Sequence, residues 1–196
     1  MTVRCIPAAR IAPEPWRNGG GRTRELLAWP SSANWRLRVS LADVDRDGAF
    51  SAFPGVQRWF AVVEGAGVAL AFDGAAERRL VLGDAPLGFD GAAAPACRLL
   101  GGPTRDLNLM LRDGRGTMQA VVAGQDWAEG HAMRGLFVRV AGRWSGDNAS
   151  ARLAPRTLLW SDDASLRATP WRFDADQPDG SPPGWWLGCT PDEAAP

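Results

Sequence analysis

Short apolar runs separated by polar turns recur along the whole chain. Examples are WRLRVSLADV (35–44), RWFAVVEG (58–65), DLNLML (106–111) and LFVRVAG (136–142), with glycine, proline or aspartate between such runs. Runs of this length and punctuation are typical of strands in a sandwich or barrel. The one helical candidate, GGRTRELLAW (20–29), is ended by Pro30. We therefore predict an all-β protein.

Alternation within three of these runs predicts polar rows on one sheet face. In the first run, Arg38, Ser40 and Ala42 lie opposite to the apolar row that begins at Trp35. In DLNLML, Asp106, Asn108 and Met110 share the face opposite to three leucines, and Arg58 shares a face with Phe60 and Val62. Because Asp and Asn are poor strand formers, they indicate a specific polar partner. If these rows meet inside a barrel, they form a small polar pocket in an apolar wall, which is typical of a ligand site.

The chain divides into two parts at RDGRG (112–116), a charged, glycine-rich segment without large apolar groups. We expect a first domain over residues 1–113 and a smaller second domain with a C-terminal tail over residues 114–196. The tail carries Trp185 and Trp186, and two exposed indoles would form a costly apolar patch. We therefore expect part of the tail to dock on the body.

Charge and cysteine usage exclude several classes of protein. The 22 basic residues balance the 22 acidic ones, so neither nucleic acid nor an anionic membrane is an expected partner. The three cysteines are scattered, without C-x-x-C spacing, which favours a reducing cytoplasm over a disulfide framework. No run is long enough for a signal peptide or a transmembrane helix, so we expect a cytoplasmic protein.

The stretch PWRNGGGRTRE (15–25) invites a phosphate-loop interpretation, which its surroundings do not support. Lysine is absent from the chain, the glycines do not have dinucleotide-binding spacing, and two prolines precede them. A plain glycine turn without a ligand is the structural alternative.

Arginine in the polar rows predicts a small anionic ligand, because its planar fork gives a carboxylate two charge-assisted hydrogen bonds. The alternative is an internal ion pair in which Asp106 holds Arg38 or Arg58. His131 is the only histidine, so the usual catalytic metal set is not available and no metal or other cofactor is expected.

Three segments together resemble the HutD/Ves family of bacterial proteins. They are PWRNGGGRTREL, then RVSLADVDRDGAFSAFPGVQRWFAVVEGAG, and then FDGAAAPACRLLGGPTRDLNLMLR, in the family's order and within the first 112 residues. The resemblance implies a cupin-type β-barrel, duplicated into a bicupin whose first barrel carries the pocket. It also implies a regulatory protein of histidine utilisation that senses a metabolite such as urocanate or formylglutamate.

On this interpretation the glycine loop lies across the mouth of the first barrel, where backbone N–H groups approach a bound carboxylate. Arg58 and Arg38 bind that carboxylate, Asp106 and Asn108 orient it or an arginine, and the remaining residues add hydrogen bonds or apolar wall. The predicted ligand-binding residues are Trp16, Asn18, Gly19, Gly20, Thr23, Arg38, Ser40, Phe50, Arg58, Asp106 and Asn108.

Two other functions stay open. One is a metal-independent isomerase or hydrolase that acts on a small carboxylated metabolite, with Asp106 as general base. The other is a partner-binding module with an inert barrel. The sequence also leaves open whether the chain forms a homodimer.

Overall fold

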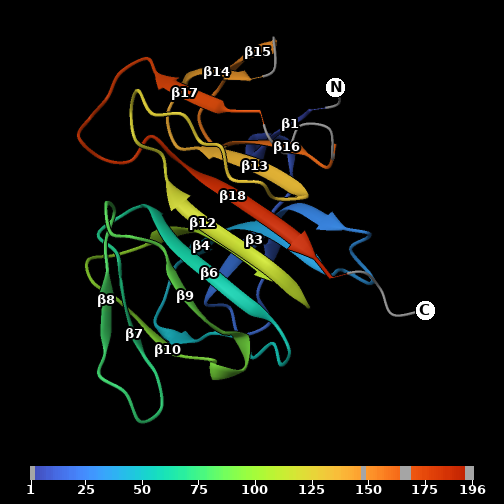
Figure 1. The fold of residues 1–196 in the computed structure, drawn as a ribbon. Coiled ribbons are helices and arrows are strands. Elements are labelled where there is room, and N and C mark those ends of the chain that lie inside the picture. Colours follow the sequence, from blue (N-terminus) through green and yellow to red (C-terminus); the bar gives the residue numbers. More distant parts are fainter. Residues whose placement is uncertain (1–2, 147–148, 164–168, 193–196) are drawn as a thin grey trace. The chain divides into compact units, whose positions relative to one another are not determined.

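The computed structural model describes residues 3–146, 149–163 and 169–192 and is built almost entirely from strands (Figure 1). Its only helices are two short 3-10 turns in those residues, η1 (Ala8–Arg10) and η2 (Gly91–Ala93). The prediction of an all-β protein is confirmed. Among the described residues, no helix is long and apolar enough to cross a membrane.

The chain forms two compact units, Ile11–Asp113 and the combination of Met1–Arg10 with Gly114–Pro196. The first ten residues, which the sequence analysis places in the first domain, therefore belong to the second unit. The reason is backbone pairing, since β1 (Arg4–Pro7) is antiparallel to β16 (Thr157–Ser161). Short range alternation in a sequence does not show which distant strand a terminal segment joins.

The Ile11–Asp113 unit contains two antiparallel sheets. The larger sheet has the order β2-β3-β4-β11-β6-β9 and the smaller has the order β5-β10-β7-β8. The strands of the larger sheet are β2 (Glu14–Pro15), β3 (Gly21–Trp29), β4 (Leu37–Val44), β11 (Thr104–Leu111), β6 (Gln57–Glu64) and β9 (Leu87–Asp90). Those of the smaller are β5 (Gly48–Ala49), β10 (Ala96–Leu99), β7 (Val68–Ala71) and β8 (Arg78–Leu80).

The prediction of a short helix over GGRTRELLAW (20–29) is wrong, because Gly21–Trp29 is strand β3. Its backbone pairs with β4 along nearly its whole length, with a register shift between Glu25 and Leu27. This shift interrupts the simple alternation of side chains and explains why the run does not read as a strand.

Apolar side chains from both sheets fill the interior of this unit. Val44, Phe60 and Val62 from the larger sheet pack with Val68, Leu70 and Cys97 from the smaller one. Phe60, Val68 and Leu70 have no exposed surface. Val44, Phe60 and Val62 share the strand faces of the polar side chains on β4 and β6, so this apolar core adjoins those polar side chains.

The second unit repeats the two-sheet arrangement. One sheet has the order β1-β16-β13-β18-β12 and the other has the order β15-β14-β17. The strands not yet given are β12 (Gly114–Ala120), β13 (Met133–Val138), β14 (Gly142–Gly146), β15 (Ala149–Leu153), β17 (Trp171–Ala175) and β18 (Gly184–Pro191).

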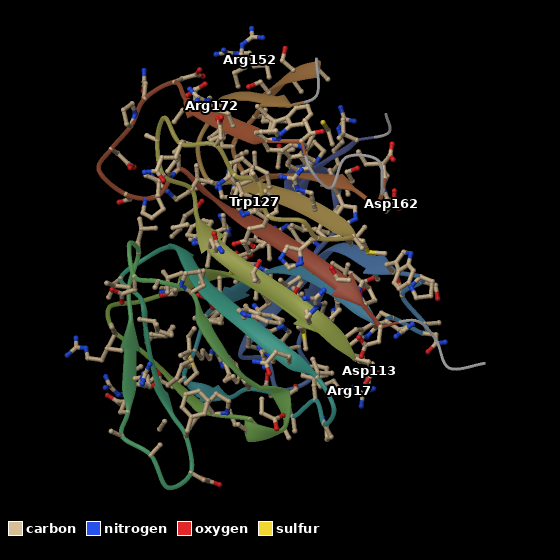
Figure 2. The ribbon with its side chains drawn as sticks, in the orientation of Figure 1. Arg17, Asp113, Trp127, Arg152, Asp162 and Arg172 are labelled. Carbon is tan, nitrogen blue, oxygen red and sulfur yellow. The ribbon has the colours of Figure 1, made fainter. Side chains whose placement is uncertain are left out.

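Tryptophans dominate the core of the second unit. Trp127, labelled in Figure 2, stacks on Trp186 with ring centroids 5.2 Å apart, and Trp171 packs edge-on against Trp144. Trp185 and Trp186 are buried in β18, so the prediction that the tail docks on the body is confirmed.

Candidate functional site

A cavity of about 680 Å³ lies in the Ile11–Asp113 unit, within the size range of small-molecule sites. Its walls come from the segment around β2 and β3, from β4, β6 and β11, and from the residues around β5 and after it. The lining consists of Glu14, Pro15, Trp16, Arg17, Asn18, Thr23, Arg38, Ser40, Ala42, Val44, Ala49, Phe50, Ser51, Phe53, Arg58, Asp106, Asn108 and Met110.

Strand register brings the predicted polar rows together. In the antiparallel pair β4 and β11, Asn108 lies opposite Ser40, and Asp106 lies opposite Ala42. On the other side of β11, Met110 lies opposite Arg58 of β6. Because β11 is the central strand, the polar rows of three strands face the same cavity.

Arg58 is a buried cation with unused hydrogen-bonding capacity. The residue is 6% exposed, and its Nη2 donates to Oδ1 of Asn108 over 2.8 Å. The guanidinium carbon lies 5.0 to 5.8 Å from the ring centroids of Phe50, Phe53 and Phe89. The Nε and Nη1 atoms are buried and have no hydrogen-bond partner among the described residues.

The charge of Arg58 survives its burial. Burial lowers the pKa of the guanidinium from its ordinary 12.5 to about 10, with a further lowering by Arg38 and an opposing effect from Asp106. A group with this pKa is still protonated at neutral pH. The cavity therefore presents a positive charge that rests on aromatic rings and a neutral amide.

Asp106 is the second incompletely satisfied group of the cavity wall. It has no exposed surface, and neither carboxyl oxygen has a hydrogen-bond partner in the described part of the chain. Burial raises its pKa well above the usual value, while Arg58 lowers it and Asp43 raises it further. Burial is the largest of these effects, so the cavity wall favours the protonated form of this carboxyl group.

The alternative of an internal ion pair with Asp106 does not hold in this structure. Arg38 pairs instead with Glu25 of β3, with 2.9 Å between Nε and Oε2, and Arg58 is held by Asn108. In the described residues, Asp106 forms no ion pair within 4.0 Å with either arginine. The arginine that carries no protein carboxylate is thus Arg58.

The predicted contacts of the glycine loop differ from the observed ones. Gly19 and Gly20 lie outside the cavity lining, and their amide groups donate to the Trp16 carbonyl and to Oδ1 of Asn18, both at 3.0 Å. The carbonyl of Gly20 in turn accepts from the amides of Asp45 and Arg46. Because these backbone groups stabilise a tight turn, they are not free to meet a carboxylate.

The other nine predicted residues all line the cavity. The side chain of Trp16 is fixed by a hydrogen bond from its Nε1 to Oγ1 of Thr23 over 2.7 Å and by edge-on packing against Phe50. Asn18 lies at the turn beside Arg17, which is labelled in Figure 2. No ligand is present, so their role in binding stays a prediction.

Several residues of the site were not predicted, although the sequence held a signal for some. Met110 and Ala42 continue the alternating rows that contain Asp106 and Ser40, and Glu25 closes the glycine-rich motif. Phe89 of β9 begins the third of the family-like segments, but only the pairing of β9 with β6 brings it over Arg58. Local sequence carries no signal for such a contact.

The opposite face of β4 carries a different charged cluster, centred on Asp43. This carboxylate accepts from Arg22, Arg24 and Arg105 at 3.1, 2.8 and 2.6 Å, and Arg105 also donates to Glu64. Although burial raises its pKa, the arginines lower the pKa of Asp43 to about 2. Since its charges are paired with one another, this cluster stabilises the sheet.

His131 lies in the second unit, outside the cavity. Its Nε2 is 3.1 Å from Oε2 of Glu129, and Thr117 and Thr190 contact its two ring nitrogens. Across the described residues, no group of three or more His, Cys, Asp and Glu side chains is arranged to hold a metal ion.

Comparisons with known proteins agree with the fold and with the motifs. The HutD family model matches residues 8–178. A Pseudomonas putida protein named for the hutC 3' region is 42% identical over 100 residues, which is 49% of this chain and 51% of that relative. Protein Ves of Cronobacter sakazakii is 31% identical over 151 residues, 76% of this chain and 82% of the relative.

Solved structures extend the similarity to nearly the full length. HutD from Pseudomonas fluorescens SBW25, determined in a formate condition, has a TM-score of 0.80 and 26% identity, covering 96% of this chain and 98% of that one. Escherichia coli pirin, solved with nickel(II), has a TM-score of 0.60 at 11% identity, covering 97% and 99%, and shows the fold alone. The prediction of a duplicated cupin-type fold is confirmed, and this chain belongs to the HutD family.

Proposed function

We propose that this chain binds a small carboxylate in the cavity of its Ile11–Asp113 unit. The observation that carries the proposal is the state of Arg58, a buried cation that is held by a neutral amide and keeps two nitrogen atoms without a partner. A carboxylate supplies both the compensating charge and the acceptors that such a guanidinium lacks.

A second buried arginine of the same chain shows how a buried guanidinium can find hydrogen-bond acceptors within the protein. Arg134 of the second unit, 2% exposed, donates to the Thr169 and Trp127 carbonyls over 2.6 and 2.9 Å. Its guanidinium lies 4.5 and 4.6 Å from the Trp127 and Trp171 ring centroids. Backbone carbonyls thus accept from both terminal nitrogen atoms of Arg134, whereas among the described residues only the Asn108 side chain accepts from Arg58, which supports a role in binding.

The biological role that we propose is regulation of histidine utilisation by a sensed metabolite. The family is associated with this process through names such as that of the relative from the hutC region, and the P. fluorescens structure was determined in a formate condition. Urocanate and formylglutamate both carry a carboxylate and fit within the volume of the cavity. We propose one of these intermediates as the metabolite.

The alternative of a metal-independent isomerase or hydrolase has weaker support. It requires Asp106 to accept a proton from the substrate, whereas burial raises the pKa of this carboxyl group well above its usual value. Binding therefore explains the same residues with fewer conditions.

Isothermal titration calorimetry with formate, urocanate, formylglutamate and histidine tests the proposal. We expect at least one carboxylate to bind with better than millimolar affinity. Arg58→Ala should weaken that binding at least about 30-fold, because a buried charge loses its partner. Arg58→Met preserves the apolar stem packed on the phenylalanines and should weaken it similarly.

The matched control is Arg79→Ala, which removes an exposed arginine of β8 outside the cavity and should leave the affinity unchanged. The proposal fails if none of the carboxylates binds, or if the Arg58 variants bind as well as the unmodified chain.

A further inference from the structure

Asp106 lies deep in the cavity wall, beside the residue that holds Arg58. It occupies the central strand β11 with Ala42 of β4 on one side and Val62 of β6 on the other. Asn108 is two residues along the same strand, so the two side chains project from the same face about 7 Å apart. The carboxyl group is thus placed to contact a ligand that also contacts Arg58.

The charged and titratable groups around Asp106 come from several strands. Arg58 reaches it electrostatically from β6 and lowers its pKa, and Asp43 of β4 raises it. Burial raises the pKa of the Cys97 thiol of β10 to about 12, and electrostatic interaction with Asp106 raises this pKa by a smaller amount. The thiol therefore stays neutral at physiological pH and adds no negative charge beside Asp106.

Arg38 of β4 lines the cavity and is compensated by Glu25 of β3, with which it forms an ion pair at 2.9 Å. The lining holds two further cations, Arg17, which is exposed, and Arg58, which is buried. Arg58 is therefore the buried cation of the wall, within the described residues, that can balance a new negative charge. An ionised Asp106 would use that capacity, yet in this structure the two groups form no ion pair.

Hydrogen-bonding capacity identifies the ligand group that fits between them. A neutral carboxyl group offers one O–H donor, and Arg58 offers the N–H groups of its unpartnered Nε and Nη1. Both sides are therefore donors in need of an acceptor. A carboxylate has two acceptor oxygens and a negative charge, whereas an amine would meet Asp106 but be repelled by Arg58.

We propose that Asp106 is a specificity-determining residue whose carboxyl group, protonated in the complex, donates a hydrogen bond to the ligand carboxylate held by Arg58, so that the cavity takes up a proton with the carboxylate wherever Asp106 is ionised in the free protein. This inference rests on the proposed function and goes beyond it, because it makes binding depend on pH through a residue other than the arginine. A buried polar donor left unpaired is costly, and the bound carboxylate removes that cost.

Titration of formate into the full chain between pH 5.5 and 8.5 tests the inference. Formate stays ionised over this range, and Arg58 stays charged because its pKa is about 10. We expect the dissociation constant to rise with pH, approaching tenfold per pH unit where Asp106 is ionised in the free protein. Repeating the titration in two buffers that differ in ionisation enthalpy should show an uptake approaching one proton per formate there.

Asp106→Asn retains a hydrogen-bond donor of nearly the same shape but cannot ionise. It should bind formate with a dissociation constant that is independent of pH and without proton uptake. The matched control, Asp73→Asn, makes the same chemical change in an exposed turn of the same unit and should retain the pH dependence of the unmodified chain.

The outcomes separate the inference from the proposed function. If the unmodified chain binds no formate and no other carboxylate, the proposed function fails. If formate binds with a flat pH profile, or with a slope that Asp106→Asn does not change, the proposed function stands and the role of Asp106 is refuted. Should Asp106→Asn fail to fold, the proton uptake of the unmodified chain decides by itself.

Discussion

Asp43 is expected to contribute stability that depends strongly on pH. Three arginines donate to its carboxylate, which is only 8% exposed, so the substitution Asp43→Asn removes a charge on which the whole cluster is centred. Ion pairs of this kind differ from the exposed pairs that contribute little, because the acceptor is shielded from water.

The pKa of Asp43 gives the magnitude. Hydrogen bonds from Arg105, Arg24 and Arg22 outweigh the effect of burial and lower the pKa from an ordinary 3.8 to about 2. This difference corresponds to about 2 kcal/mol of folding free energy. Because the folded-state pKa lies below the unfolded one, the contribution is complete above about pH 5. It is lost as the pH falls, by about 1 kcal/mol at pH 3 and about 2 kcal/mol at pH 2.

Urea unfolding of the unmodified chain and of Asp43→Asn, followed by circular dichroism from pH 7 down to pH 2, measures this contribution. The free-energy difference between the two proteins should be at least about 2 kcal/mol at neutral pH and should shrink on acidification. The control Asp45→Asn removes an acid that is 39% exposed and 3.9 Å from Arg22, and it should change stability by less than about 0.5 kcal/mol. A difference for Asp43→Asn that stays constant from pH 7 to pH 2 would refute the reasoning.

Two further predictions concern the glycine turn and the thiols. Gly21→Ala should lower the unfolding free energy by more than about 1 kcal/mol, because the added Cβ would lie 2.2 Å from the Asp43 carbonyl. Gly20→Ala meets only the Asn18 side chain at 3.2 Å and should cost less, so equal urea midpoints for the two variants would contradict this account. In the folded protein only Cys5, which is exposed, should react rapidly with a thiol reagent at pH 8, because Cys97 and Cys189 are buried and burial raises both of their pKa values. If mass spectrometry detects rapid modification of more than one thiol, the core around a buried cysteine is accessible to the reagent and the prediction is wrong.

Alternation alone was sufficient to predict the polar rows that β4, β6 and β11 contribute to the cavity wall. A strand places every second residue on the same face, so Ser40 and Asn108 could be assigned to polar rows before their pairing was known. The same rule fails in β3, where the register shift after Glu25 breaks the alternation and made a strand resemble a helix. It also fails for the glycine turn, since the partners of its amide groups depend on backbone geometry that residue types do not encode.

Three features could be predicted from local pattern, because each depends on residues that are close in sequence. They are the all-β class, the segment at residues 112–116 where the chain divides, and the polar rows of β4, β6 and β11. Three features needed the tertiary structure. They are the pairing of β1 with β16, the phenylalanines that surround Arg58, and the choice of Glu25 as the partner of Arg38. The pairing of β1 with β16 joins strands from distant parts of the chain, and in all three cases period-two alternation says which face a side chain occupies but not which side chain it meets. Whether a buried charge is compensated depends on that contact, which is why the sequence could not distinguish Arg38, which forms an ion pair with Glu25, from Arg58, which forms no ion pair among the described residues.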